Sequence, residues 1–193
     1  MHIAETLNQL PSLLGGKRFS LQYLGDGDYF LAVSVNQNTE VRKSFNVKDN
    51  IYEILEGIGK SVRLVSMGLK PVFSASYVVS TVLPAASVED GDGVVLLGRG
   101  NNIAGIITGD NVLDPDSYKR LMHDIVLSGA AALVVYVHRD STLPSPETIQ
   151  LSGRLCKSLK AFGIMPLDVV VINREAGEYY SFYRELTEKI KSS

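Results

Sequence analysis

The apolar run AAALVVYV, residues 130–137, constrains the fold of this chain most strongly. A strand that is apolar at nearly every position has to be covered on both faces, as in sheets with helices on each side. A polar loop follows at residues 138–144, and then Ser145 and Pro146, a favoured N-cap and first helical residue. The sequence therefore predicts a buried strand, a loop and a capped helix in direct succession.

The segments around this run extend the same pattern. Apolar runs at residues 94–99 and 103–108 predict two strands, and Asp114 with Pro115 predicts the start of a helix. That helix is expected to bury one apolar stripe: Tyr118, Leu121, Met122, Ile125 and Val126. The helix after Ser145 is expected to turn inward Ile149, Leu155, Cys156 and Leu159. With strands at residues 167–172 and 177–184, the order ββαβαββ predicts an α/β sandwich.

Residues 1–83 are interpreted as a smaller α+β unit of unrecognised type. We expect helices at residues 3–14 and 47–60, and strands at residues 17–24, 29–35, 39–45, 62–67 and 72–83. Residues 84–92 are small and polar, which favours a linker. Residues 93–185 would then form the second domain, and residues 186–193 a solvated tail.

Composition excludes several classes of protein. The formal net charge of −2 provides no basic footprint for nucleic acid. A single cysteine, Cys156, excludes an internal disulfide framework and favours a reducing compartment. No export signal or membrane-spanning apolar run is recognised, so the expected location is the cytoplasm, without a membrane partner.

Residues 93–185 resemble the RadC-like JAB/MPN domain family. The resemblance rests on an alanine-rich strand, a Pro-Ser pair that opens a helix, a Leu-Asp strand start and a Tyr-Tyr-Ser-Phe strand. The matching positions here are Ala130–Ala132, Pro144–Ser145, Gly163–Ile164, Leu167–Asp168 and Tyr179–Phe182. The resemblance implies a JAB/MPN mixed-sheet sandwich of the cytidine-deaminase-like type, preceded here by the smaller α+β unit.

Catalytic members of the family hold zinc with two histidines and an aspartate, and use a glutamate as base. Carried over without gaps from Ser145, the histidine positions fall on Val135 and Val137, and the aspartate position falls on Thr148. Valine has no lone pair for a metal and neutral threonine is a poor zinc ligand. The family serine and the aspartate of Leu-Asp-His remain, as Ser145 and Asp168. The resemblance therefore implies a degenerate metallopeptidase fold, a pseudoenzyme without a zinc cofactor.

A shorter loop offers an alternative alignment. It places His138 and Asp140 at the two histidine positions, two residues apart, while Thr148 still occupies the third. This alternative is a zinc peptidase or isopeptidase with shifted ligands. Neither alignment supplies the glutamate base.

We expect a non-catalytic module that acts by binding another protein, in the DNA-repair or mobile-element setting associated with the family. The rim of the former cleft is predicted to comprise His138, Arg139, Asp140, Ser145 and Asp168. A second alternative is nucleic-acid binding through Arg139, Arg154, Lys157 and Lys160. Nearby acidic residues balance the positive charge of this set. Elemental analysis for zinc and a salt-dependent DNA titration separate these hypotheses.

Overall fold

The computed structural model describes residues 10–12, 14–37, 39–88, 91–109, 112–173, 175 and 177–182. The first part of the chain folds into an antiparallel three-stranded sheet, β1 (Phe19–Gly25), β2 (Asp28–Asn36) and β3 (Thr39–Asn46), in that order. A turn at residues 25–28 joins β1 to β2 with positive φ at Gly25, Asp26 and Gly27. These three strands confirm the predicted ones. The predicted helix at residues 3–14 lies mostly outside the described residues, which retain helix only at residues 10–12.

The second sheet has five strands in the order β5-β4-β6-β7-β8. They are β4 (Asp92–Leu97), β5 (Ile103–Gly109), β6 (Ala132–His138), β7 (Met165–Asn173) and β8 (Glu178–Ser181). Only β6 and β7 pair in parallel, so the sheet is mixed. A short 3₁₀ turn, η2 (Arg99–Asn101), connects β4 to β5.

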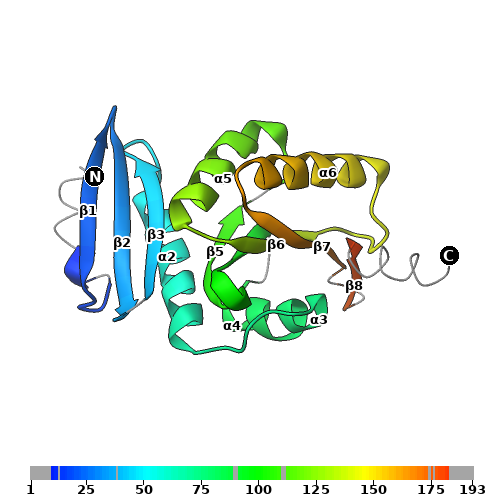
Figure 1. Cartoon of the computed structure of the whole chain (residues 1–193), viewed down its shortest axis with the longest axis horizontal. Helices are drawn as coiled ribbons and strands as arrows, with labels where there is room; N and C mark the ends of the chain where they lie inside the picture. Colours follow the sequence, from blue (N-terminus) through cyan, green and yellow to red (C-terminus); the bar gives the residue numbers. More distant parts are fainter. Residues whose placement is uncertain are drawn as a thin grey trace.

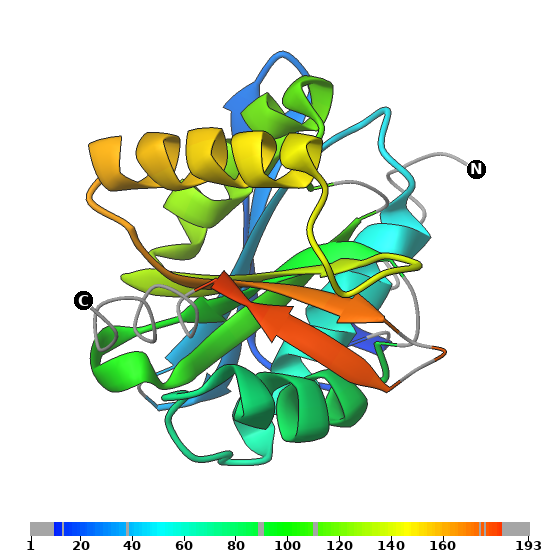
Figure 2. The same cartoon turned by 90° about the vertical axis from the view of Figure 1, so that its right-hand side faces the viewer.

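Helices cover both faces of this sheet, as the apolar run of β6 requires. α5 (Pro115–Ser128) and α6 (Pro146–Ala161) lie on one face; α3 (Ala75–Tyr77), η1 (Val78–Val82) and α4 (Leu83–Ala85) lie on the other (Figures 1 and 2). α2 (Ile51–Ser66) lies between the two sheets (Figure 1). The mixed α/β sandwich and the order ββαβαββ are confirmed.

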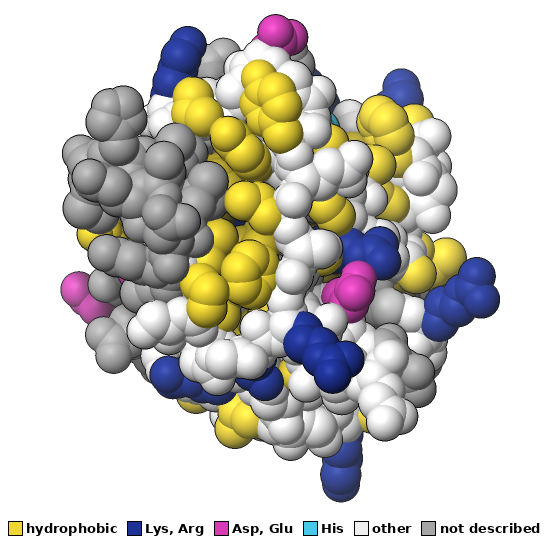
Figure 3. Space-filling view, turned by 90° about the vertical axis from the view of Figure 1, so that its left-hand side faces the viewer, with side chains coloured by type: hydrophobic (Ala, Val, Ile, Leu, Met, Phe, Trp, Pro, Cys, Tyr) yellow, Lys and Arg dark blue, Asp and Glu magenta, His cyan; other side chains and the backbone are white. Residues whose placement is uncertain are grey.

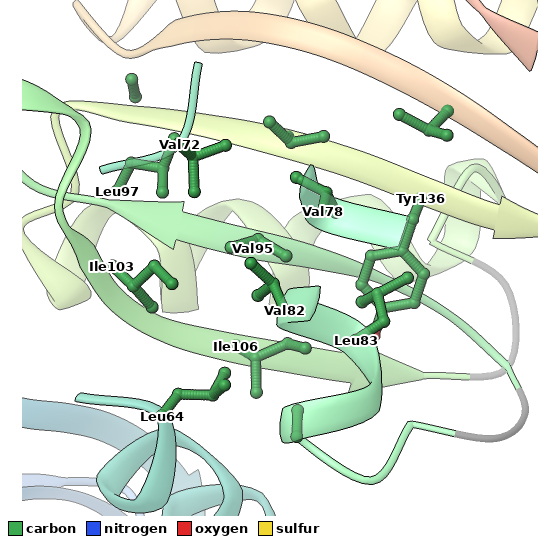
Figure 4. Close-up of a cluster of buried hydrophobic side chains, with 14 of the residues drawn as sticks. Leu64, Val72, Val78, Val82, Leu83, Val95, Leu97, Ile103, Ile106 and Tyr136 are labelled. Atoms are coloured by element: carbon green, nitrogen blue, oxygen red, sulfur yellow. The ribbon is translucent and has the colours of Figure 1, made fainter. Parts of the chain in front are cut away.

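The strands predicted at residues 62–67 and 72–83 are wrong, because residues 62–66 belong to α2 and helical turns begin again at residue 75. Arg63 and Leu64 continue α2, and the Ser74 hydroxyl caps the turn that leads into η1. Val78 and Val82, one helical turn apart, are fully buried in a cluster that also contains Val95 and Tyr136 (Figure 4). Burial on the sheet has outweighed the strand preference of the β-branched residues.

The hydrophobic core extends across the predicted linker. Leu64, Val72 and Leu83 pack in the same cluster as Leu97 and Ile106 (Figure 4), so chain segments before and after residues 84–92 share this core. The domain boundaries themselves stay a prediction. The predicted tail at residues 186–193 lies outside the described residues.

Two of the predicted inward positions are wrong. Val126 on α5 and Ile149 on α6 are exposed, whereas the rest of each stripe is buried or half-buried. Hydrophobic side chains also gather on the side of the three-stranded sheet that faces away from the five-stranded one (Figure 3). Tyr23 and Leu24 are the most exposed hydrophobic residues of that sheet. None of the helices in the described part of the chain has the length and hydropathy of a membrane-crossing segment.

Candidate functional site

The candidate site lies where β6 ends and α6 begins. β6 and β7 run in parallel, with His138 opposite Ile172, and the chain then crosses to α6 through the loop at residues 139–144. In α/β sheets, groups at the carboxyl ends of parallel strands commonly form ligand sites. This is also the position at which the sequence predicts a degenerate metal site.

Val135 and Val137, which the gapless register predicts to stand at the two histidine positions, are completely buried. With Leu133 they form the side of β6 that packs under α5 and α6, in a cluster with Leu155 and Val171. Their isopropyl groups therefore contribute apolar burial in a sealed core.

Thr148 is buried at the first turn of α6, and its partner is another hydroxyl. The Ser145 Oγ accepts the Thr148 backbone N–H at 3.1 Å and lies 3.0 Å from the Thr148 Oγ1. Ser145 is thus the N-cap that the sequence predicts, and its hydroxyl is engaged at this helix start. One turn further, the buried Ser152 Oγ has no hydrogen-bond partner among the described residues.

A second contact crosses the space between α5 and α6. The Tyr118 hydroxyl donates to the Leu151 carbonyl oxygen at 2.8 Å. Burial raises the pKa of this phenol. The two helices that cover Val135 and Val137 are therefore joined directly by a hydrogen bond.

His138 and Arg139 both contact the start of β4. The His138 Nδ1 lies at hydrogen-bond distance from the Gly91 carbonyl and, because a carbonyl only accepts, carries the proton of this bond. The ring also makes an edge-on contact with Tyr136, which belongs to the opposite face of β6 from Val137. Arg139 makes a bidentate ion pair with Asp92, at 2.8 and 3.0 Å.

The remaining predicted rim residues are dispersed. Asp140 is exposed, and its carbonyl accepts from the Asn173 amide at 3.0 Å. Asp168 lies opposite Val134, four residues before the His138 end of the strand pair, which is about 13 Å along a strand. Its carboxylate accepts from the Val169 N–H and the Ser181 hydroxyl. The structure thus brings Ser145 and Thr148 together, and places Asp168 elsewhere.

These residues do not fit a zinc ion. The gapless register supplies two valines and a threonine, and the shifted register supplies a histidine on the wrong face of β6. Within the described residues, no group of three or more His, Cys, Asp or Glu side chains is placed to hold a metal.

Sequence reasoning missed the role of Asp92, which it assigned to the linker. Asp92 is 2% exposed, begins β4 and also accepts the His138 backbone N–H at 3.0 Å. The sequence does show that Asp92 directly precedes an apolar strand. Its partner Arg139, which follows β6, could not be identified without the antiparallel pairing of β4 with β6.

Comparison with known protein families matches residues 109–188 to the RadC-like JAB domain. This agrees with the segment that carries the resemblance in the sequence. A search of the curated proteins finds no match to the chain.

Proposed function

We propose that this chain, whose residues 109–188 match the RadC-like JAB domain, is a non-catalytic member that binds another protein through the rim of a former active site. The setting we propose is the DNA-repair or mobile-element context associated with the family. A fold can lose its catalytic site and still be stable, so the domain can serve as a binding module without the original reaction.

The burial of Val135 and Val137 carries the non-catalytic part of the proposal. A catalytic zinc needs three protein ligands and an open position for water. Here the corresponding side chains are apolar and closed off beneath α5 and α6. The Ser145 hydroxyl, which would polarise a substrate in the catalytic members, is used as a helix cap.

Two exposed aliphatic residues next to the predicted rim support the choice of a protein as the partner. Leu143 in the loop before α6 is 76% exposed, and Ile149 in the first turns of α6 is 51% exposed. Exposed aliphatic side chains beside a rigid helix start can contribute to a protein interface through burial of apolar area. Asp140 and Glu147 are exposed on the same segment, so a partner with basic groups around an apolar contact would complement it.

The two alternatives receive less support. A shifted zinc site requires His138 and Thr148 to converge, although their side chains belong to opposite faces of the sheet. Arg139 is a poor candidate for phosphate binding, because its guanidinium is paired with Asp92. Arg154, Lys157 and Lys160 stay exposed on α6, which makes a salt-dependent DNA titration a direct check.

A matched pair of surface variants tests the proposal. Leu143→Ser with Ile149→Ser, the rim variant, removes the two exposed aliphatic side chains next to the rim. Tyr23→Ser with Leu24→Ser, the control, removes exposed apolar side chains on the three-stranded sheet. Proteins cross-linked to the full chain in its native host would be compared by quantitative mass spectrometry. We expect one set of partners to be lost with the rim variant and retained with the control. Equal recovery with all three proteins would refute the rim as the binding surface.

A further inference from the structure

Strand β5 forms an edge of the five-stranded sheet, and its sequence offers little protection against pairing with another strand. Its residues, IAGIITG, include no charge and no proline, and the register shift in its pairing with β4 lies at its first residues, before Ile106. Natural edge strands usually avoid unwanted pairing by charged residues, proline, strong bulges or a covering element. An uncharged edge rich in β-branched residues is therefore expected to be covered.

The cover is α2, and Ser61 makes the contact. The Ser61 Oγ donates to the Ile106 carbonyl at 3.0 Å and accepts the Ile106 N–H at 3.0 Å. Both backbone groups of one residue point to the same side of a strand, so these two point outward from the sheet. A single hydroxyl thus takes the place that a neighbouring strand would occupy at Ile106.

The surroundings of Ser61 hold it in this position. On α2, Ile58 packs with the three-stranded sheet and Leu64 packs with the five-stranded one, and Ser61 lies between them, 4% exposed. On β5, a Cβ added to Gly105 would lie 3.1 Å from the Ser61 Oγ and 3.3 Å from its Cβ. A glycine at position 105 allows the close approach of the helix.

We infer that α2 is a protective cover that prevents β5 from pairing with β5 of a second copy of this chain, and that Ser61 is the residue through which the cover acts. A second copy is the occupant because its own β5 is an equally uncharged edge of the same length. This device is separate from the proposed partner-binding rim, which lies on another part of the domain.

Amide hydrogen exchange of the full chain, resolved by residue with NMR, tests the contact. Ser61→Ala removes the hydroxyl, Ser61→Thr keeps it, and Ser66→Ala repeats the substitution at an exposed position of the same helix. We expect the Ile106 amide to exchange about tenfold faster in Ser61→Ala alone, while the Ile107 amide keeps its protection. Unchanged protection of Ile106 in Ser61→Ala would overturn the role of Ser61.

Sedimentation over a range of protein concentrations tests whether β5 pairs with a second copy once this contact is removed. Ser61→Ala should associate more strongly than the unmodified protein, and a second change, Thr108→Lys, should abolish the added association by placing a charge on the β5 edge. If Ser61→Ala does not fold, Gly105→Ala disturbs the same contact from the strand and should have the same effects. A variant that loses Ile106 protection but sediments like the unmodified protein would refute self-pairing of this edge.

Discussion

Arg139 neutralises Asp92 across two antiparallel strands: its guanidinium donates to both carboxylate oxygens, and the carboxylate is almost completely buried. The sequence assigned one of these residues to a linker and the other to a binding rim. Their pairing instead fixes the end of β6 to the start of β4.

Removing only the arginine of this ion pair should lower the free energy of unfolding. Arg139→Met leaves a buried carboxylate without its cation, and we expect a loss of about 3 kcal/mol in the free energy of unfolding. The double variant Asp92→Asn with Arg139→Met should recover part of this loss, because the uncompensated charge is gone. Urea unfolding gives both values, with the exposed Arg154→Met as a control expected within about 0.5 kcal/mol of the unmodified protein. A loss of that small size in Arg139→Met would show that the pair is unimportant.

Tyr136 presents the opposite case, a buried hydroxyl with no hydrogen-bond partner among the described residues. Tyr136→Phe removes the unsatisfied group and keeps the ring, so we expect stability to rise by about 1 kcal/mol. Thermal unfolding measures this change. A decrease of similar size would mean that the hydroxyl is satisfied in solution.

The Tyr136 hydroxyl should also make the free energy of unfolding depend on pH in the alkaline range. Burial raises the pKa of Tyr136, and the nearby Asp92 carboxylate raises it further. An unfolded tyrosine titrates near pH 10, so above about that pH the unfolded chain releases a proton that the folded chain keeps. Stability should therefore fall as pH rises, by up to about 1.4 kcal/mol per pH unit for this group. Tyr136→Phe should show a correspondingly shallower decline, and identical slopes for both proteins would contradict the assignment.

Much of this fold could be predicted because its signals are local. The continuous apolar run of β6, the cap at Ser145 and the turn before β2 each specify their element without distant contacts. The helical turns around Val78 could not be separated from a strand, since their β-branched residues favour a strand and only packing on the sheet decides. The spacing of Val78 and Val82 does not decide the matter, because residues four apart share one face in a helix and in a strand alike.

The candidate site was harder to predict than the fold. The gapless register from Ser145 predicts that Val135 and Val137 occupy the histidine positions, and the structure shows that both side chains are completely buried. The face to which His138 points depends on its contacts with Gly91 and Tyr136, which come from other parts of the sheet. Asp168 could be matched in sequence, but its distance from Ser145 follows from where β7 begins relative to β6.

Restoring histidine at positions 135 and 137 should destabilise the protein. Two imidazoles would enter a sealed apolar cluster, and each lacks a hydrogen-bond partner there. We expect a loss of about 1–3 kcal/mol for each unsatisfied group in metal-free buffer. The conservative Val135→Ile with Val137→Ile is a control for changed volume. An unchanged melting temperature for the histidine variant would place these side chains at the surface and invalidate the register.

Substitutions at Ser145 separate capping from binding. Ser145→Ala removes the acceptor for the Thr148 N–H and should cost about 1 kcal/mol. Ser145→Asp keeps an acceptor and suits the helix dipole, so its stability should match that of the unmodified protein. Chemical unfolding of both variants measures the cap. A partner that binds Ser145→Ala but not Ser145→Asp would indicate that the cleft rim is used for recognition.

The proposal that the segment matching the RadC-like JAB domain holds no zinc is tested most directly by the metal content of the protein. The full chain, purified without chelator, would be measured by elemental mass spectrometry beside a His138→Ala variant. We predict well under one equivalent of zinc in both proteins, because neither register supplies three ligands. One equivalent of zinc in the unmodified protein that disappears in His138→Ala would contradict this account and favour a metallopeptidase with shifted ligands.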